Sequence, residues 1–260
     1  MGTAVFFHAH PDDESIATGG TMVKLASEGH RVIAVFATKG EHGEVEPGFL
    51  NPGEELWQRR MKEAAASAKI LGAERIEFLG YVDSGMIGTP ENEKPDCFWQ
   101  ADVEEAAERL ARILREEKAD VLTVYDENGN YGHPDHIQVH RVGIRAAELA
   151  GTPRVFESTL DQDYMRELIK MGKDLGLDEV PEGDAGEFNM GVPGALITTR
   201  VDVKPFLDRK KESMKAHASQ ISETSFFLKM PDFVFELVWG TECYIRRGAP
   251  DGTVEDDLFA

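Results

Sequence analysis

Short runs of apolar, β-branched residues alternate along most of the chain with longer segments in which apolar positions recur at the period of an α-helix. This alternation is typical of a parallel sheet whose strands are joined by helices. It predicts strands near residues 3–8, 32–37, 75–79, 120–125 and 153–158. It predicts helices near residues 14–29, 56–72, 101–118, 135–150 and 162–174. The expected fold class is therefore α/β.

The last third of the chain departs from this alternation. Residues 176–195 are acidic and rich in glycine, which indicates a linker or loop. A further unit follows, with a strand over 197–203, a helix from Lys204 to about Gln220, and then a helical or irregular tail. We therefore expect a C-terminal α+β elaboration beside the main sheet.

These patterns predict one domain over residues 1–260, a length that a single α/β domain with a substantial core can have. A Rossmann-like core over residues 1–160 is expected to hold a mostly parallel sheet with helices on both faces, and residues 161–260 to form the elaboration. In the doubly wound order 3-2-1-4-5, strands one and four are neighbours at the point where the winding reverses and ligands bind.

The net charge narrows the classes of partner. The chain carries 48 acidic and 28 basic residues, which gives a formal net charge of −20. Nucleic acids and anionic membranes are bound by clustered Lys and Arg, so neither is an expected partner. A small-molecule substrate fits this charge better. Whether the chain forms a homo-oligomer is left open.

The cysteines and the first residues of the chain indicate the cellular compartment in which the protein is expected. Cys97 and Cys243 form no C-x-x-C pattern, so neither a disulfide framework nor a thiolate zinc site is expected, and both are predicted to be buried apolar residues. The chain opens with a strand in place of a signal segment, and no apolar run is long enough to span a membrane. We expect a cytoplasmic protein.

Two clusters of histidine and aspartate lie where predicted strands give way to helices. The first follows strand one, as His10-Pro11-Asp12-Asp13-Glu14, and the second follows strand four, as His133-Pro134-Asp135-His136. A catalytic zinc needs three protein ligands and one open position. His10, Asp13 and His136 would supply that set, which leaves Asp12 and His133 unligated beside the open position. One Zn²⁺ per chain is expected, with Fe²⁺ as the alternative, because two histidines and one carboxylate also form the triad of non-haem iron.

Two polar loops also follow predicted strands. One spans residues 40–53 and contains His42, and the other spans residues 83–97. Loops at the carboxyl ends of parallel strands build the active sites of open α/β sheets. We therefore place both loops at the rim of the pocket that holds the two clusters.

Each cluster also has a purely structural interpretation. Asp12, Asp13 and Glu14 after a proline look like an ordinary helix N-terminus, where carboxylates meet free amides and the positive end of the helix dipole. The second cluster could be a turn and a helix start with exposed imidazoles. The positions of both clusters at strand ends, and their complementary ligands, favour the metal site. His8 alternates with His10 on the first strand and is expected to be a hydrogen-bonded core histidine.

The two clusters resemble those of a known enzyme family. Residues 9–14 and 131–136 are similar to the two motifs of the LmbE-like (PIG-L) family of zinc-dependent de-N-acetylases, and this pair of motifs is highly specific. Arg60 with Glu63, the loop over residues 83–86 and the loop over residues 40–44 match positions in the mycothiol-pathway members. The resemblance covers about the first 160 residues.

The resemblance implies hydrolysis of an N-acetyl group, or of a related amide, on a glucosamine-containing small molecule. It implies that His10, Asp13 and His136 bind zinc and that Asp12 is the general base. Zinc lowers the pKa of bound water from about 15.7 to about 7, which provides a nucleophile at neutral pH. Asp12 would remove the water proton and later deliver it to the departing amine.

The remaining site residues are also implied by the resemblance. His133 would stabilise the oxyanion, and Asp135 would orient His133 from behind. Tyr131 would assist the tetrahedral intermediate and the leaving amine. The substrate would be bound by Arg60, Asp83, Met86 and Glu41. His217 resembles a residue of a family helix near the site, with a structural role as the alternative.

Within the mycothiol branch, the sequence favours the deacetylase of N-acetylglucosaminyl-inositol. The mycothiol S-conjugate amidase typically carries a lysine shortly after the first motif and a proline before the second, where this chain has Ala17 and Gly132. The amidase stays an alternative, because residues 126–129 resemble the amidase group. Deacetylases of other amino sugars are a further alternative. A non-catalytic metal- or sugar-binding protein is disfavoured by the presence of Asp12. A nucleotide-binding protein is disfavoured because carboxylates replace a glycine-rich phosphate loop.

Overall fold

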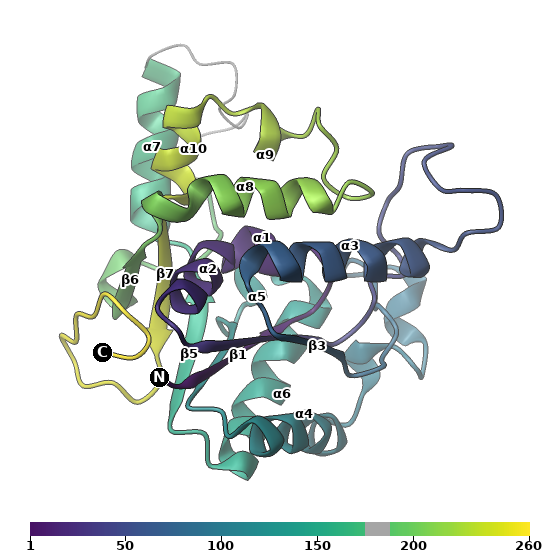
Figure 1. The fold of residues 1–260 in the computed structure, drawn as a ribbon, viewed down its shortest axis with the longest axis horizontal. Helices are drawn as coiled ribbons and strands as arrows, with labels where there is room; N and C mark the ends of the chain where they lie inside the picture. Colours follow the sequence, from purple (N-terminus) through teal and green to yellow (C-terminus); the bar gives the residue numbers. More distant parts are fainter. Residues whose placement is uncertain (175–187) are drawn as a thin grey trace.

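The computed structural model describes residues 1–174 and 188–260, which form a seven-stranded sheet with helices on both faces (Figure 1). Five parallel strands run in the order β3-β2-β1-β4-β5. Strand β7 pairs antiparallel with β5, and β6 pairs antiparallel with β7 at the edge of the sheet. The strands are β1 (Thr3–His8), β2 (Arg31–Phe36), β3 (Arg75–Phe78), β4 (Val121–Tyr125), β5 (Arg154–Thr159), β6 (Thr199–Asp202) and β7 (Thr241–Arg246).

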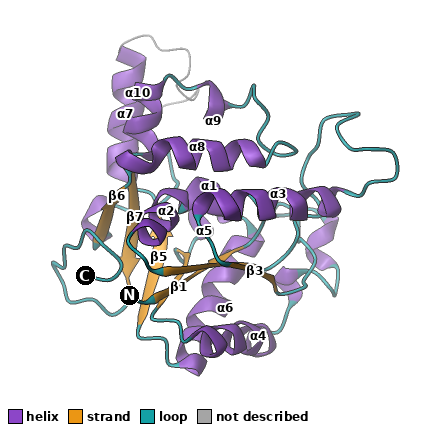
Figure 2. Cartoon of the chain, in the orientation of Figure 1, coloured by secondary structure: helices purple, strands orange, loops and turns teal. Residues whose placement is uncertain are grey.

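The helices differ widely in length (Figure 2). The α-helices are α1 (Asp13–Ala17), α2 (Gly19–Ser27), α3 (Leu56–Leu71), α4 (Val103–Glu117), α5 (Gly129–Gly132), α6 (Pro134–Ala150), α7 (Gln162–Asp174), α8 (Leu207–Ala216), α9 (Phe226–Lys229) and α10 (Asp232–Trp239). The 3₁₀ helices are η1 (Pro90–Glu93), η2 (Phe98–Gln100), η4 (Gly194–Leu196) and η5 (Lys204–Phe206).

The central strands are buried on both faces because helices cover each side of the sheet. Successive side chains of β1 point to opposite faces, as the two-residue period of a strand requires. Phe7 packs into the core under α4 and α6, and Phe6 packs into the core under α2 and α3. Figure 1 shows α4 and α6 below the sheet and α2, α3 and α8 above it. These two cores hold the carboxyl ends of the strands in fixed positions.

The predicted α/β fold class and the strand order 3-2-1-4-5 are confirmed. The predicted helix over residues 14–29 is two helices, because Thr18 leaves the helical conformation at φ −136° and ψ 6°. The Thr18 hydroxyl donates to the carbonyl oxygen of Glu14 at 3.3 Å. The break separates α1, which carries part of the first cluster, from α2.

The C-terminal third differs from the prediction in two places. The helix expected to reach Gln220 ends at Ala216, and the chain turns at His217, whose amide donates to the carbonyl oxygen of Met214. The expected helical or irregular tail contains a strand, β7, that the sequence pattern does not predict. Glu242, the second residue of β7, is buried, so a charged residue at an inward position hides the apolar pattern of the strand. Both cysteines are buried, as predicted.

Part of the predicted linker over 176–195 lies outside the described residues, up to residue 187. Residues 188–195 of this segment are described, and Val192 forms a parallel bridge with Asp161, two residues after the end of β5. The division into a core over 1–160 and an elaboration over 161–260 stays a prediction. Within the two described ranges, none of the helices combines the length and apolar character that crossing a membrane would require.

Candidate functional site

The two histidine clusters meet at the carboxyl ends of β1 and β4, which are neighbours in the sheet. The Asp13 carboxylate lies between two imidazoles, with Oδ2 3.5 Å from His10 Nδ1 and Oδ1 3.4 Å from His136 Nε2. One ligand atom from each of the three residues falls within 4.8 Å of the others. Two imidazole nitrogens and one carboxylate are a donor set that suits Zn²⁺ or Fe²⁺. The residues therefore fit the expected metal.

The local sequence explains how these ligands are presented. Asp13 is the first residue of α1, and His136 lies in the first turn of α6, which starts with Pro134. Both clusters therefore begin helices, as the structural interpretation expected, but the imidazoles of His133 and His136 are buried and not exposed. A helix start directs side chains of the first turn back toward the strand end. The same turns thus begin two helices and bring the three donors together.

Asp12 lies beside the three donors, in an unusual backbone conformation. Its φ of 118° and ψ of −32° belong to a region that residues other than glycine rarely adopt. Burial raises the pKa of Asp12 to about 6, with the Arg60 guanidinium opposing this shift and Asp13 adding to it. A carboxylate with a pKa close to the working pH is suited to general-base chemistry.

His133 faces the same space as a neutral ring. Burial, together with the neighbouring His10 and His136, lowers the pKa of His133 to about 4. Its Nδ1 accepts a hydrogen bond from the backbone N–H of Asp135 at 3.1 Å. The proton of the neutral ring is therefore on Nε2, which leaves a hydrogen-bond donor for a developing oxyanion.

The Asp135 side chain does not lie where we expected it. Its carboxylate is fully buried and contacts His10, with Oδ2 3.1 Å from Nε2. It also accepts hydrogen bonds from the backbone N–H and the hydroxyl of Ser84. Only the backbone of Asp135 reaches His133. A carboxylate behind a ligand histidine fixes its orientation, so Asp135 supports His10 rather than His133.

Tyr131 lies at the mouth of the site on the short helix α5. Its ring is 46% exposed, yet its hydroxyl lies 3.4 Å from His136 Nε2. The hydroxyl is therefore close to the candidate metal position and also reachable from solvent. This placement suits contact with a substrate.

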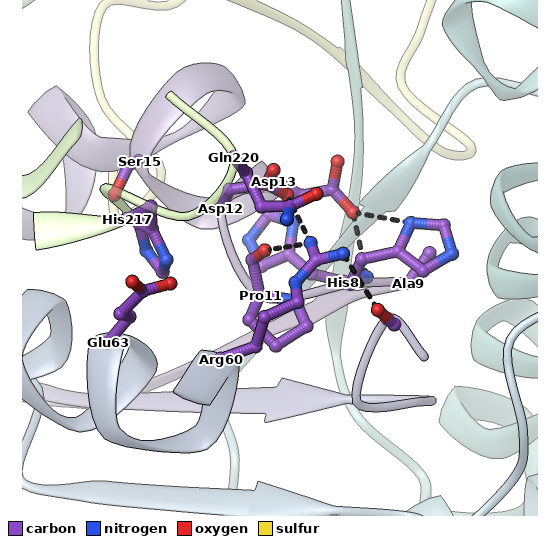
Figure 3. Close-up of polar contacts among 12 residues, drawn as sticks. His8, Ala9, Pro11, Asp12, Asp13, Ser15, Arg60, Glu63, His217 and Gln220 are labelled. Carbon is purple, nitrogen blue, oxygen red and sulfur yellow. Dashed lines mark hydrogen bonds and ion pairs between the residues drawn. The ribbon is translucent and has the colours of Figure 1, made fainter. Parts of the chain in front are cut away.

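Arg60 is buried against the backbone of the first cluster. Its Nη1 donates to the carbonyl oxygen of Gly40 at 3.0 Å, and its Nη2 donates to that of Pro11 and lies 3.2 Å from Asp12 Oδ1 (Figure 3). Through these contacts Arg60 also holds Asp12. The guanidinium is expected to bind the substrate. Each terminal nitrogen carries two N–H groups, so these contacts leave donors free, and Arg60 also lines the cavity. Substrate binding by Arg60 stays a prediction.

The other three predicted substrate-binding residues are placed differently from one another. Asp83 is buried and accepts from the amides of Gly85 and His42, and its Oδ1 lies 3.5 Å from His10 Nε2. Met86 is half exposed on the same loop and lines the cavity. Glu41 lies behind the loop, where its Oε2 accepts from the Asp83 amide at 3.1 Å. Glu41 shapes the loop and does not line the cavity.

The site opens into a cavity of about 680 Å³. Both predicted rim loops contribute, through residues such as His42 and Met86. The C-terminal third supplies a wall that the sequence did not reveal, formed by Gln220, Phe227 and Trp239. Gln220 lies close to His217, whose resemblance to a family helix was the one signal for this wall, and only the aromatic character of the tail points to Phe227 and Trp239.

His8 is a core histidine, as predicted. Its Nδ1 lies 2.9 Å from the hydroxyl of Tyr125, and its Nε2 lies 3.1 Å from that of Thr18. Burial lowers the pKa of His8 to about 4, so the ring is neutral. His8 thus supports the end of β1 beneath the candidate ligands.

Comparison with known proteins adds independent information. The family model described as GlcNAc-PI de-N-acetylase (PIG-L) matches residues 5–147. A 1D-myo-inositol 2-acetamido-2-deoxy-alpha-D-glucopyranoside deacetylase from Catenulispora acidiphila is 39% identical over 281 residues, which cover 97% of this chain and 87% of the relative. A relative with the same type of name from Acidothermus cellulolyticus is 40% identical, with 97% and 92% covered.

A solved structure shows the same fold at lower identity. The N,N'-diacetylchitobiose deacetylase from Pyrococcus horikoshii superposes with a TM-score of 0.57 at 24% identity, covering 94% of this chain and 83% of that chain. At this identity the likeness concerns the fold alone. The sequence relatives, which are matched over nearly their whole length, carry the information on function.

Proposed function

Because the chain belongs to the PIG-L family of GlcNAc-PI de-N-acetylases, we propose that it is a metal-dependent deacetylase that removes the N-acetyl group of N-acetylglucosaminyl-inositol. The single observation that carries this reaction is the meeting of His10, Asp13 and His136 around one point, with Asp12 beside them. The relatives that match nearly the whole chain are named for this substrate. Their names favour the deacetylase over the S-conjugate amidase, as Ala17 and Gly132 do.

We assign one Zn²⁺ per chain to His10, Asp13 and His136, with Fe²⁺ as the alternative. A metal bound there supplies Lewis acidity and makes water a nucleophile near neutral pH. Asp135 keeps the imidazole of His10 in a fixed orientation from the opposite ring nitrogen. Burial alone would raise the pKa of Asp13, but His136 and His10 lower it well below its usual value, so Asp13 is a carboxylate.

Asp12 is the general base in this proposal. It removes one proton from the attacking water as the C–O bond forms, and it delivers that proton to the nitrogen as the C–N bond breaks. The products are acetate and the free amine, so no covalent intermediate and no other reactant are needed. The Arg60 guanidinium, 3.2 Å from Asp12 Oδ1, stabilises the carboxylate form that starts the cycle.

His133 and Tyr131 serve the developing negative charge and the leaving group. His133 donates from Nε2, because its Nδ1 is already occupied as an acceptor. Tyr131 offers a hydroxyl from the mouth of the cavity, 3.4 Å from His136 Nε2. The sugar and its inositol occupy the cavity bounded by Asp83, Met86 and the C-terminal wall.

A comparison of substrates tests this function. Zinc-loaded protein is incubated with N-acetylglucosaminyl-inositol, free N-acetylglucosamine, N-acetylglucosaminyl malate and a mycothiol S-conjugate, and the released amine or acetate is measured. We expect the highest kcat/KM for N-acetylglucosaminyl-inositol. Faster cleavage of the mycothiol conjugate would assign the chain to the amidases. No cleavage of any of the four by metal-loaded protein would reject the function.

A further inference from the structure

Glu14 follows the candidate ligand Asp13 directly, yet its side chain points away from the cavity. It is fully buried, and its Oε2 accepts a hydrogen bond from the backbone N–H of Asp12 at 2.9 Å. Its Oε1 lies 2.6 Å from His217 Nε2. The hydroxyls of Ser67 and Ser15 donate to the same oxygen. The Glu14 carboxylate thus joins Asp12, the proposed general base, to His217, which lies 203 positions after Glu14 in the chain.

The side chain of His217 makes its hydrogen bond to Glu14 and no other in the described structure. The ring is fully buried at the end of α8, and its Nδ1 has no hydrogen-bond partner within residues 1–174 and 188–260. Its Nε2 therefore makes the one polar contact that the ring has in the described structure. Burying the other ring nitrogen unpaired costs stability, so the contact with Glu14 is the favourable interaction that offsets this cost.

The backbone of Asp12 needs such support. Its φ of 118° is strained for a residue with a side chain, and strain of this kind persists only where the surroundings hold it. Glu14 holds the N–H of Asp12, and Arg60 holds the preceding carbonyl oxygen of Pro11. The two contacts hold opposite edges of the peptide group between Pro11 and Asp12, and so fix the plane of that group. Together they fix the direction in which the Asp12 carboxylate leaves the chain.

We propose that Glu14 and His217 form a positioning pair, which keeps the strained Asp12 backbone in the conformation that aims its carboxylate at the candidate metal. The proposal rests on the function assigned above, in which Asp12 is the general base. It gives the C-terminal third a role in the chemistry through His217, for which the sequence left a structural role as the alternative. His217 acts through Glu14 and touches no substrate.

A second buried pair from the same helix provides a matched comparison. Lys210 of α8 and Glu242 of β7 form an ion pair, and both side chains are buried. Glu242 accepts from the amides of Gly20 and Thr21 at the start of α2, and Lys210 donates to the carbonyl oxygen of Ile16. This pair docks the C-terminal third onto the same N-terminal helices, but it makes no contact with Asp12 in the described structure. Variants of the Lys210–Glu242 pair therefore test whether loss of docking alone, without loss of the Asp12 contact, changes activity.

The test is a double-mutant cycle on metal-loaded protein. His217→Leu removes the donor to Glu14, and we expect kcat to fall by about 100-fold, the size that a small misplacement of a catalytic group can have. KM and metal content should stay near the wild-type values. In an Asp12→Asn background, the same substitution should add little further loss, because the group that it positions is already gone. An equal loss in both backgrounds would overturn the proposal.

Two further variants keep the test decisive if His217→Leu folds poorly. His217→Gln retains a side-chain donor and should recover most of the activity. Glu14→Leu should behave like His217→Leu, because it removes the acceptors of both the Asp12 amide and His217. The control is Lys210→Met combined with Glu242→Gln, which should leave the coupling to Asp12 unchanged. If the control substitutions lowered kcat in the protein with Asp12 but not in the Asp12→Asn background, the control pair would also be coupled to Asp12. That result would contradict the distinction between the two pairs.

A second readout does not depend on activity. In metal-free protein, NMR hydrogen exchange of the Asp12 amide reports the bond to Glu14 directly. We expect exchange at Asp12 to accelerate in His217→Leu and in Glu14→Leu and to stay slow in the Lys210 and Glu242 control. Unchanged protection in both test variants would reject the positioning pair. This measurement stands even if no substrate is cleaved, so failure of the pair and failure of the proposed function are distinguishable.

Discussion

The floor and the wall of the cavity are built in different ways. The floor is formed at the ends of β1 and β4, where His10, Asp12, Asp13, His133 and His136 converge. Its side chains are linked to one another and to buried partners by hydrogen bonds and ion pairs. The wall comes from the C-terminal third and is mainly aromatic, with the rings of Phe227 and Trp239 5.9 Å apart.

This difference indicates a division of labour. A polar network whose members hold one another is rigid, which suits bond making and breaking. An apolar wall provides contact area without fixing individual atoms, which suits recognition of a substrate. Changes in the floor should therefore alter metal content or kcat, and changes in the wall should alter KM. The following predictions test that division, from the largest expected effect to the smallest.

Removal of a metal ligand should have the largest effect. We expect wild-type protein to hold about one metal ion per chain and His136→Ala to lose both the metal and the activity. His140→Ala is the control, because His140 lies on the same helix and contacts the carbonyl oxygen of Tyr125 instead. Elemental analysis and a deacetylation assay measure both. Wild-type metal content in His136→Ala would remove His136 from the floor as a ligand.

Substitution of Asp12, the proposed general base, should have a different effect from substitution of the adjacent Asp13, a proposed metal ligand. Asp12→Asn should keep the metal and the fold and lower kcat by roughly 100- to 10,000-fold, the contribution of a positioned general base. Asp13→Asn should weaken metal binding instead, because Asp13 lies between the two histidines. Metal analysis combined with kinetics distinguishes the two. Near-normal turnover by metal-loaded Asp12→Asn would contradict the mechanism.

The oxyanion donor comes next. His133→Ala removes the Nε2 donor, and loss of such a donor typically costs about 2.7–4 kcal/mol in the barrier. We expect kcat to fall with KM and metal content little changed, since His133 is not among the proposed ligands. Steady-state kinetics at several substrate concentrations separates the two constants. An effect on KM alone would move His133 from the chemistry to substrate binding.

The pH dependence should follow Asp12. Activity requires the carboxylate form, and burial raises the pKa of Asp12 to about 6, so kcat/KM should rise with pH through this region and fall about tenfold per unit below it. Positive charge from a bound metal acts in the same direction as Arg60, which places the midpoint at or below pH 6. His133, with a pKa of about 4, adds no limb in this range. A rate profile for wild type and Asp12→Asn measures the limb, which should be absent from the variant.

The floor could largely be predicted from the sequence, and physical reasons explain this. Its residues lie in two short motifs at strand ends, and the strand order that brings them together follows from the alternation of strands and helices. What could not be predicted was which partner each side chain selects. Asp135 contacts His10 instead of His133, and Arg60 uses its donors on Gly40 and Pro11. Such choices depend on rotamers and on distances across the fold.

The wall could not be predicted, because nothing local defines it. Strand β7 is a strand by virtue of its pairing with β5 and β6, and its buried Glu242 breaks the apolar alternation. His217 meets Glu14 only when α8 packs on the helices that follow β1. The sequence shows the aromatic residues of the tail but not the cavity that they face. Long-range packing therefore determines the wall, whereas local motifs determine the floor.

The smallest expected effect tests the wall itself. Phe227 lines the cavity, and truncation to alanine removes apolar surface from the substrate side without touching the polar network of the floor. Burial of a phenylalanine side chain contributes about 1.5–3 kcal/mol, and losing part of this should raise KM by about tenfold or less. We expect kcat to be unchanged, because contacts made equally in the ground state and the transition state leave the chemical step alone.

Phe226→Ala is the matched control for this wall. The preceding phenylalanine is 47% exposed and does not line the cavity, so its truncation should leave both constants near wild type. Saturation kinetics with N-acetylglucosaminyl-inositol compares the two variants under the same conditions. A fall in kcat for Phe227→Ala, with KM constant, would show that the wall takes part in the chemical step. The division between a catalytic floor and a recognising wall would then be wrong, and the C-terminal third would act on the reaction through its aromatic residues as well as through His217.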